Sequence, residues 1–360
     1  MNETSPAAQR LTGIHLWMRA EVRATERRAP ITPRDAATLI ADGAELTVEH
    51  SDQRVFDIGE YAEAGAAIVE TGSWVDAPSH AYVVGIKELP EEPAELRHTH
   101  IFFAHAYKGQ DGAAEMLARF ERGGGELLDV EYLTVNGRRV VAFGYWAGYV
   151  GASLTLLAAH GALRGPLTPT TRAAMDQDVR DHCAPTGASL VIGARGRSGR
   201  GAVDALASAG WEATRWGMRD TAHLDKTRLL EHEVMVNCVV SHRPQEPFVT
   251  LDDVAVSDRQ LRVIGDVTCD VTSANNLLPL NHSVTTWENP ARRFTADNTS
   301  PDHAQTPPLD VIAIDNLPSL LPLEASVSFS ADFTPLLVDL AHRAGPFAAA
   351  RNTFRQATTR

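Results

Sequence analysis

Short runs of apolar residues alternate with amphipathic stretches along most of the chain, and this pattern predicts strands separated by helices. In the first half, the predicted strands cover residues 13–17, 45–49, 66–69, 82–86, 101–104, 126–130 and 140–143. The predicted helices cover residues 35–41, 113–122 and 145–163; the second ends at three consecutive glycines, a common helix stop.

The second half repeats the alternation. Its predicted strands cover residues 189–192, 212–216, 234–238, 261–267 and 310–314. Helices are expected over residues 199–209 and 335–343, and the stretch DNLPSLLPLEAS interrupts the pattern between the last strand and the second of these helices. Because strands that alternate with helices are typical of parallel sheets, we expect an α/β fold of two domains that meet near residue 145.

Two successive predicted strands each end in a titratable residue. The run VVGI leads into Lys87, and the run IFFA leads into His105. Ligands of open α/β sheets bind beyond the carboxyl ends of the strands, where a lysine can act as a base and a histidine can transfer protons near neutral pH. The alternatives are a solvated lysine and a half-buried histidine with ordinary structural partners.

A glycine-rich segment connects a predicted strand to a predicted helix. Gly193, Gly196 and Gly199 follow the strand at 189–192, in the position where dinucleotide-binding folds hold a pyrophosphate. The alternative is a tight strand-to-helix turn that binds no ligand. The context of strand before and helix after favours a dinucleotide site.

The next strand does not end in the acidic residue that usually binds the ribose. Gly217 stands there, 24 residues after Gly193, with Arg215 and Arg219 beside it. Without an acid to repel a 2′-phosphate, NADP(H) is possible as well as NAD(H). Asp220 could still bind the ribose if the loop bends back.

Composition narrows the classes of partner. The 360 residues carry a formal net charge of −13, which argues against nucleic acid and anionic membranes as partners. No stretch is long and apolar enough to predict a membrane span, and the first residues lack an apolar signal core. The three cysteines lack metal-binding spacing. We therefore expect a cytoplasmic protein without a metal site, a monomer or a small homo-oligomer, that acts on small molecules.

Several motifs together resemble the lysine-forming saccharopine dehydrogenases. They are GIKELP, HIFFAHAYKGQ, GRRVVAFGYWAGYVGA, VIGARGRSGRGA and IDNLPSLLPLEAS, in the family's order and along nearly the whole chain. The resemblance implies two Rossmann-like domains, a layout shared with alanine dehydrogenase and transhydrogenase, with the active site in the cleft between them. We expect residues 1–144 and 318–360 to form the catalytic domain and residues 145–317 the dinucleotide-binding domain. The implied reaction is the cleavage of saccharopine with NAD to L-lysine and 2-oxoglutarate.

The resemblance also implies roles for individual residues. Lys87 matches the catalytic base and His105 the acid–base histidine, and Lys108 and Glu131 match their neighbours. The matched substrate contacts are Arg28, Gln110, Arg139, Phe143, Thr268, Cys269 and Asp270. The matched cofactor contacts are Arg138, Gly193, Gly196, Arg197, Gly199, Thr221, Val240, Val267, Ile314, Asp315, Asn316 and Leu317.

The chain departs from the family at Gly217, Asn316 and Leu323, and in the stretch VTSANNLLP after Asp270. These departures leave open the cofactor and the amine. The alternatives are an opine-type dehydrogenase with another amine or oxo acid, an enzyme that uses free ammonia as alanine dehydrogenase does, and a catalytically idle cofactor-binding protein. The retention of Lys87 and His105 argues against the last.

Overall fold

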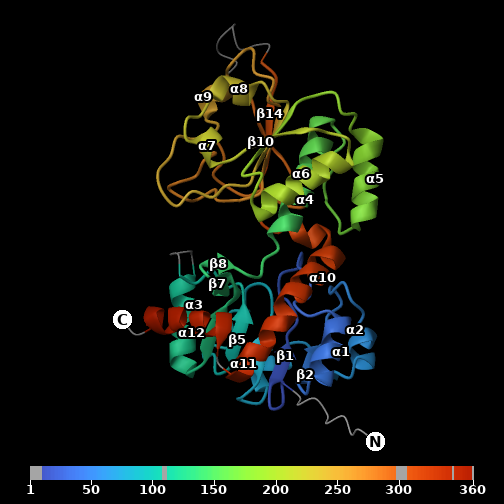
Figure 1. The fold of residues 1–360 in the computed structure, drawn as a ribbon, viewed down its shortest axis with the longest axis vertical. Helices are drawn as coiled ribbons and strands as arrows, with labels where there is room; N and C mark the ends of the chain where they lie inside the picture. The colour runs from blue at the N-terminus through green and yellow to red at the C-terminus, as the bar shows by residue number, and fades with distance from the viewer. Residues whose placement is uncertain (1–9, 108–111, 297–305, 343, 359–360) are drawn as a thin grey trace, which may run out of the picture. The chain divides into compact units, whose positions relative to one another are not determined.

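The computed structural model describes residues 10–107, 112–296, 306–342 and 344–358. The chain divides into two compact units (Figure 1). Residues 1–142 together with 322–360 form unit 1, and residues 143–321 form unit 2.

Unit 1 contains a parallel sheet in the order β3-β2-β1-β4-β5-β6. Its strands are β1 (His15–Met18), β2 (Glu45–Glu49), β3 (Ala67–Val69), β4 (Tyr82–Val84), β5 (Thr99–Phe102) and β6 (Glu126–Asp129). This order is that of the doubly wound Rossmann fold, in which the chain reverses direction across the sheet between β1 and β4. Ligands of such sheets bind at this switch point, beyond the carboxyl ends of the strands.

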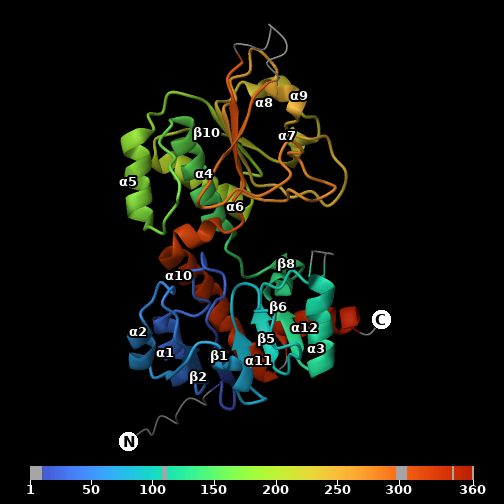
Figure 2. The same cartoon turned by 180° about the vertical axis from the view of Figure 1, so that it is seen from behind.

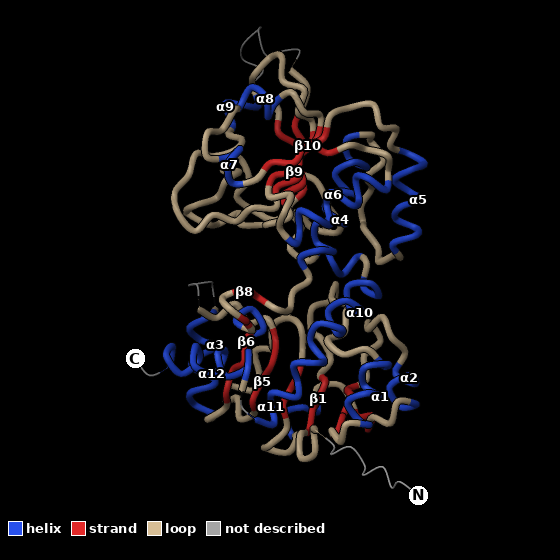
Figure 3. Tube along the Cα trace, in the orientation of Figure 1, coloured by secondary structure: helices blue, strands red, loops and turns tan. Residues whose placement is uncertain are grey.

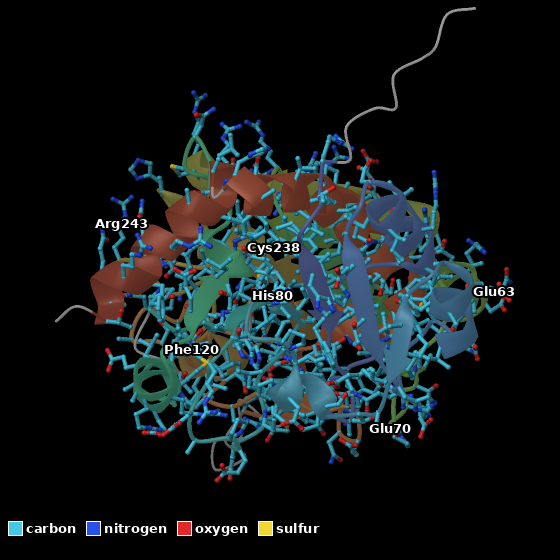
Figure 4. The ribbon with its side chains drawn as sticks, turned by 90° about the horizontal axis from the view of Figure 1, so that it is seen from below. Glu63, Glu70, His80, Phe120, Cys238 and Arg243 are labelled. Carbon is cyan, nitrogen blue, oxygen red and sulfur yellow. The ribbon has the colours of Figure 1, made fainter. Side chains whose placement is uncertain are left out.

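Helices from both ends of the sequence pack onto this sheet. They are α1 (Pro33–Ala41), α2 (Ile58–Glu63), α3 (Ala113–Gly123), α10 (Pro322–Phe333), α11 (Val338–His342) and α12 (Gly345–Thr358), with short 3₁₀ turns η1 (Ser73–Asp76), η2 (Val130–Tyr132) and η5 (Thr334–Leu337). The buried core includes Trp74, Phe102, Phe354 of α12 and Phe120 of α3, which is labelled in Figure 4. Burial of each large aromatic side chain stabilises the unit by roughly 2–3 kcal/mol.

The C-terminal segment completes unit 1 through specific hydrogen bonds. The Ala29 N–H donates to the Ser326 hydroxyl at 2.9 Å, and the Thr32 N–H donates to the Ser330 hydroxyl at 3.0 Å. These bonds attach α10 to the segment before α1, where Thr32 caps the helix by accepting the Asp35 N–H. In Figures 1 and 2 the red C-terminal helices accordingly lie among the blue and teal elements of unit 1.

Unit 2 contains a second six-stranded sheet, in the order β10-β9-β11-β12-β14-β13, parallel except for the edge strand β13. Its strands are β9 (Ser189–Ile192), β10 (Ala213–Trp216), β11 (Val234–Asn237), β12 (Val263–Asp266), β13 (Arg292–Phe294) and β14 (Leu309–Ile312). Helices α4 (Gly144–Ala159), α5 (Arg172–His182) and α6 (Arg197–Ser208) lie on one side of it, and the shorter α7 (Met218–Thr221), α8 (Lys226–Leu230) and α9 (Leu251–Val254) on the other (Figures 2 and 3). The 3₁₀ turn η4 (Leu317–Leu320) follows β14.

Glycines allow α4 and α6 to pack backbone against backbone. A Cβ atom at Gly148 would lie 1.8 Å from the Ser198 carbonyl oxygen, and one at Gly201 would lie 1.9 Å from the Tyr145 carbonyl oxygen. Any side chain at either position would force the helices apart. This contact holds α6, which follows the glycine-rich segment, against the long small-residue helix.

Parallel α/β architecture is confirmed, but two local predictions were wrong. Residues 140–143 form no strand, because the chain first makes a tight hairpin of β7 (Thr134–Val135) and β8 (Arg138–Arg139). Asn136 and Gly137 at its turn both have positive φ, as such two-residue turns require. The expected helix over residues 335–343 is instead η5 followed by α11, and α10 begins within the expected interruption. Among the described residues, none of the helices is long and apolar enough to span a membrane.

Candidate active site

Lys87 and His105 lie at the same edge of the unit 1 sheet. Lys87 follows β4 and His105 follows β5, and these strands are parallel neighbours. Their backbone pairing continues past the strands, since the Phe103 N–H donates to the Ile86 carbonyl oxygen at 3.0 Å. The pairing therefore reaches to within one residue of Lys87 and two residues of His105.

Two carboxylates lie near enough to Lys87 for its charge to act on them. Burial alone would raise the pKa of Glu26, but Arg28 and the nearby Lys87 ammonium hold it below its ordinary value. The pKa of Glu88 is also lowered against the effect of burial, chiefly by Arg23, whose Nε donates to it at 2.7 Å, and also by Lys87. Lys87 thus lies near two acids that are ionised at neutral pH.

Arg28, predicted to bind a substrate carboxylate, is 4% exposed and already holds a carboxylate of this chain. Its Nε and Nη2 atoms donate to the two oxygens of Glu26 at 2.8 and 2.5 Å. This bidentate geometry gives the strongest kind of arginine–carboxylate contact. The pair fixes Glu26 beside Lys87.

His105 belongs to a chain of three side chains linked by hydrogen bonds. Its Nδ1 atom lies 3.0 Å from Oε2 of Glu131, whose Oε1 accepts from Nη2 of Arg139 at 2.6 Å. The Glu131 side chain is 8% exposed, whereas that of His105 is 47% exposed. A carboxylate can only accept, so Nδ1 carries the proton and Nε2 is left to exchange protons with a ligand.

The backbone at His105 is also held in place. Its φ is +51°, in the left-handed region that residues other than glycine rarely adopt. Asp129, at the end of β6 and fully buried, accepts the N–H groups of Ala104 and Ala106 on either side, at 3.3 and 3.4 Å. Burial raises the pKa of Asp129. Sequence reasoning missed Asp129, although its place directly at a strand end was a usable signal.

Four other predicted residues lie in unit 1 or at its connection to unit 2. Lys108 and Gln110 lie outside the described residues. Arg138 is exposed beside Arg139 on the β7–β8 hairpin, and Phe143, which directly precedes α4, is partly buried.

In unit 2, the surroundings of the three predicted glycines differ, and each would affect an added side chain in its own way. Gly193 has a φ of +81°, and a Cβ atom there would lie 2.7 Å from Val239 Cγ2. At Gly199 a Cβ atom would lie 2.1 Å from the Gly193 carbonyl oxygen, whereas at Gly196 the nearest atom would be 3.2 Å away. In dinucleotide-binding folds, one glycine allows the tight turn, a second lets the pyrophosphate approach the backbone, and a third allows the helix to pack closely. The segment before α6 and the first turn of α6, which begins at Arg197, therefore fit a pyrophosphate.

An acidic residue lies at the end of β10 after all, and it comes from three residues beyond Gly217. The Gly217 N–H donates to Oδ2 of Asp220 at 2.8 Å, so the Asp220 carboxylate folds back onto the strand end. A Cβ atom at Gly217 would meet no heavy atom closer than this oxygen, at 4.0 Å. Thr221 ends α7, and its hydroxyl lies 3.4 Å from the Gly217 carbonyl oxygen.

The remaining predicted residues follow β11, β12 and β14. Val240 is 47% exposed, whereas the side chains of Ile314 and Leu317 are buried in the core of unit 2. Asn316 is also buried, Asp315 is exposed, and Val267 is partly buried against that core. A ligand would therefore meet Ile314 and Leu317 mainly through their backbone.

The loop after β12 is organised by an acid that sequence reasoning missed. Asp266, 2% exposed, accepts the Thr268 hydroxyl at 2.7 Å and the Asn237 amide at 3.1 Å. Burial raises its pKa. Cys269 follows with a φ of +50°, its thiol 3.5 Å from the Asp266 carbonyl oxygen, and Asp270 comes next, partly buried. Backbone strain of this kind clusters at functional sites.

Comparisons with known proteins agree with this arrangement. The alanine dehydrogenase/PNT N-terminal domain family matches residues 17–150. Among solved structures, an L-alanine dehydrogenase has a TM-score of 0.63 at 14% identity and covers 95% of this chain and 93% of its own. A transhydrogenase from Sinorhizobium meliloti has a TM-score of 0.57 at 13% identity and covers 91% and 94%. These two structures show the fold.

Sequence relatives are more specific. The saccharopine dehydrogenase [NAD(+), L-lysine-forming] of Emericella nidulans is 41% identical over 350 residues, which cover 91% of this chain and 92% of that enzyme. Its counterpart in Schizosaccharomyces pombe is 40% identical over 347 residues, which cover 91% and 93%. The chain belongs to the family of NAD-dependent, lysine-forming saccharopine dehydrogenases.

Proposed function

We propose that this chain oxidises the secondary amine of saccharopine with NAD⁺ and water, giving L-lysine, 2-oxoglutarate and NADH, or catalyses the reverse reaction. The observation that carries the proposal is the delivery of Lys87 and His105 to one edge of a parallel sheet by adjacent strands. The relatives named for this reaction support the substrate.

Lys87 and His105 supply the proton transfers of this reaction. Lys87 removes the proton of the secondary ammonium, so that the nitrogen lone pair can drive loss of hydride from the adjacent carbon. Nε2 of His105 then takes a proton from the water that attacks the resulting imine, and returns it as the carbon–nitrogen bond breaks. Glu131 stabilises the imidazolium that forms in between.

Substrate carboxylates would be bound by the predicted contacts of both units. Arg139 is the more accessible arginine, with a side chain 38% exposed. Arg28 would bind a carboxylate only by sharing its guanidinium with Glu26. The other proposed contacts are Gln110, Phe143, Thr268, Cys269 and Asp270.

NAD⁺, when bound, accepts the hydride. Gly193, Gly196 and Gly199 would hold its pyrophosphate at the start of α6. We assign the ribose to Asp220, whose carboxylate lies at the end of β10, where Gly217 stands in place of the usual acidic residue. A carboxylate there repels a 2′-phosphate, so NAD(H) is the expected cofactor and NADP(H) the poorer one. The other proposed contacts are Arg138, Arg197, Thr221, Val240, Val267, Ile314, Asp315, Asn316 and Leu317.

The test is the formation of NADH or NADPH from saccharopine, and the reverse reaction with 2-oxoglutarate and a panel of amines. Lysine is expected to be turned over far faster than ornithine or ammonia. Faster turnover of another amine would overturn the substrate, and no turnover with any combination would overturn the enzyme assignment. A cytoplasmic location and the state of a monomer or small homo-oligomer stay predictions.

A further inference from the structure

A buried ion pair lies under the loop that carries Lys87. Arg19 and Glu21 follow β1, the neighbour of β4 at the switch point of the sheet. Nη1 of Arg19 lies 3.4 Å from Oε2 of Glu21, and the two side chains are 1% and 6% exposed. Their charges are therefore compensated inside the protein rather than by water.

This ion pair holds both polar groups of the Lys87 backbone. The Glu21 carboxylate accepts the N–H groups of Ile86 and Lys87 at 2.6 and 3.0 Å. Nη2 of Arg19 donates to the carbonyl oxygen of Lys87 and lies 3.4 Å from that of Glu88. With its N–H and its carbonyl both held, the Lys87 backbone has little freedom to move the side chain.

Gly85 makes room for this arrangement. A Cβ atom at residue 85 would lie 2.6 Å from Nε, Cζ and Nη2 of Arg19, so the guanidinium occupies the space of the missing side chain. Gly85 is not among the residues of positive φ. The glycine in VVGIK is therefore explained by Arg19 and not by backbone conformation.

The ion pair also sets the charge around the base. Burial raises the pKa of Glu21, and the nearby Glu26 carboxylate raises it further, while Arg19 opposes both. Arg19, Glu21, Glu26 and Arg28 thus form a buried set of two cations and two anions beside Lys87. Removal of Arg19 would leave an uncompensated carboxylate next to the base.

We propose that Arg19 and Glu21, with Gly85 as the space that admits the Arg19 guanidinium, are positioning residues that fix Lys87 for proton transfer. This inference rests on the proposed function. A buried ion pair gives little net stability because of the cost of desolvation, so anchoring the loop for the fold alone is a weak reason for one. Its position at the switch point, with four hydrogen bonds to residues 86–88, gives it a direct effect on the base.

The experiment measures saccharopine oxidation by Arg19→Ala, Arg19→Lys and Gly85→Ala, each in the natural sequence and with Lys87→Met. Misplacement of a reacting group by about 1 Å can cost ~100-fold in rate. We expect Arg19→Ala and Gly85→Ala to lower kcat about 10- to 100-fold and to change the basic group seen in the pH profile, with KM for NAD⁺ unchanged. Arg19→Lys should lie in between, because an ammonium donates but lacks the planar fork.

Two combinations separate positioning from folding. Gly85→Ala should have no further effect with Arg19→Ala, because the methyl group then enters the space that the guanidinium left. With Lys87→Met, neither change should lower turnover further, because both act through Lys87. Equal losses with and without Lys87 would overturn the proposal, and Arg19→Lys and Gly85→Ala decide the question if Arg19→Ala does not fold.

Arg119→Ala is the matched control. Arg119 is a buried arginine of the same unit, 7% exposed, and it donates to the Pro93 carbonyl oxygen at 3.1 and 2.7 Å. This variant should lose stability and keep the natural pH profile. Inactive natural enzyme would count against the proposed function; active natural enzyme, impaired by Lys87→Met but not by Gly85→Ala or Arg19→Lys, would count against the positioning role alone.

Discussion

Nδ1 of His105 lies 3.0 Å from Oε2 of Glu131, and the other carboxylate oxygen of Glu131 is held by Arg139 at 2.6 Å. The arginine orients the carboxylate, the carboxylate selects the tautomer of the imidazole, and Nε2 is left as the group that exchanges protons. The imidazole of His105 is thereby held in one orientation, with Nε2 as the atom that transfers protons.

Glu131→Gln should make the imidazolium of His105 less stable, because it removes the negative charge beside Nδ1. Turnover is therefore expected to fall, because the charged form of His105 arises during the proposed reaction. Glu115→Gln is a suitable control, since Glu115 pairs with Arg122 on the surface of the same unit. Natural turnover in Glu131→Gln would show that Glu131 does not act on His105.

Lys87→Met and His105→Gln should each lower kcat while leaving NADH binding nearly intact, because the proposed dinucleotide contacts lie mainly in unit 2. General acid–base groups contribute ~10²–10⁴-fold to rate. Steady-state rates and fluorescence titration with NADH give the two quantities. Near-natural turnover in both variants would contradict the mechanism.

Asp220→Ala should raise the ratio of kcat/KM for NADPH to that for NADH, because it removes the carboxylate that is hydrogen-bonded to Gly217. Gly217→Asp should lower the same ratio, since the side chain at 217 would enter open space. Both ratios come from initial rates of the reductive reaction with lysine and 2-oxoglutarate. If Asp220→Ala leaves the ratio unchanged, Asp220 does not select the cofactor.

His100 should make stability fall in mild acid. Its ring is fully buried, packs edge-on against Phe120 at 5.4 Å, and has no hydrogen-bond partner for either nitrogen among the described residues. Burial is the main cause that lowers its pKa well below 6.5, helped by Arg19, His98 and Arg119. Below pH 6.5 the unfolded chain therefore binds a proton that the folded chain rejects, and this lowers the free energy of unfolding by at most about 1.4 kcal/mol per pH unit.

Urea unfolding at pH 7.5 and 5.5 measures this effect. His100→Leu should reduce the loss of stability between the two pH values, whereas His50→Gln, at an exposed position, should not. An equal loss in His100→Leu and the natural protein would exclude His100 as its source.

The sequence pattern was sufficient to place Lys87 and His105 at one sheet edge. Two apolar runs of strand length, followed by the rule that parallel strands end on the same side, led directly to that geometry. The order of strand, glycine-rich segment and helix placed Gly193 and Gly196 before α6 and Gly199 in its first turn. These predictions succeeded because they depend on local periodicity and on topology, and both can be read from neighbouring residues.

Glu21, Asp129 and Asp266 were missed for a physical reason. Each accepts a hydrogen bond from a residue at least 25 positions away, as Glu21 does from residues 86 and 87. Such pairs cannot be read from neighbouring residues. Helix α10 was missed because its first residues belong to the stretch DNLPSLLPLEAS, which was expected to interrupt the pattern, although Pro322 stands at the start of the helix, where proline is favoured. The hairpin turn at Asn136 and Gly137 had a clear signal that was overlooked.

The hydrogen bonds from Ala29 and Thr32 to Ser326 and Ser330 have a consequence for biosynthesis. On the ribosome, residues 143–321 emerge after all the strands of unit 1 and before α10, so unit 2 can finish folding while unit 1 still lacks its last helices. During that interval the donors near α1 and the apolar surface meant for α10 and α12 face solvent or chaperones. Nascent chains halted before residue 322 should therefore contain a folded unit 2 joined to a protease-sensitive N-terminal segment.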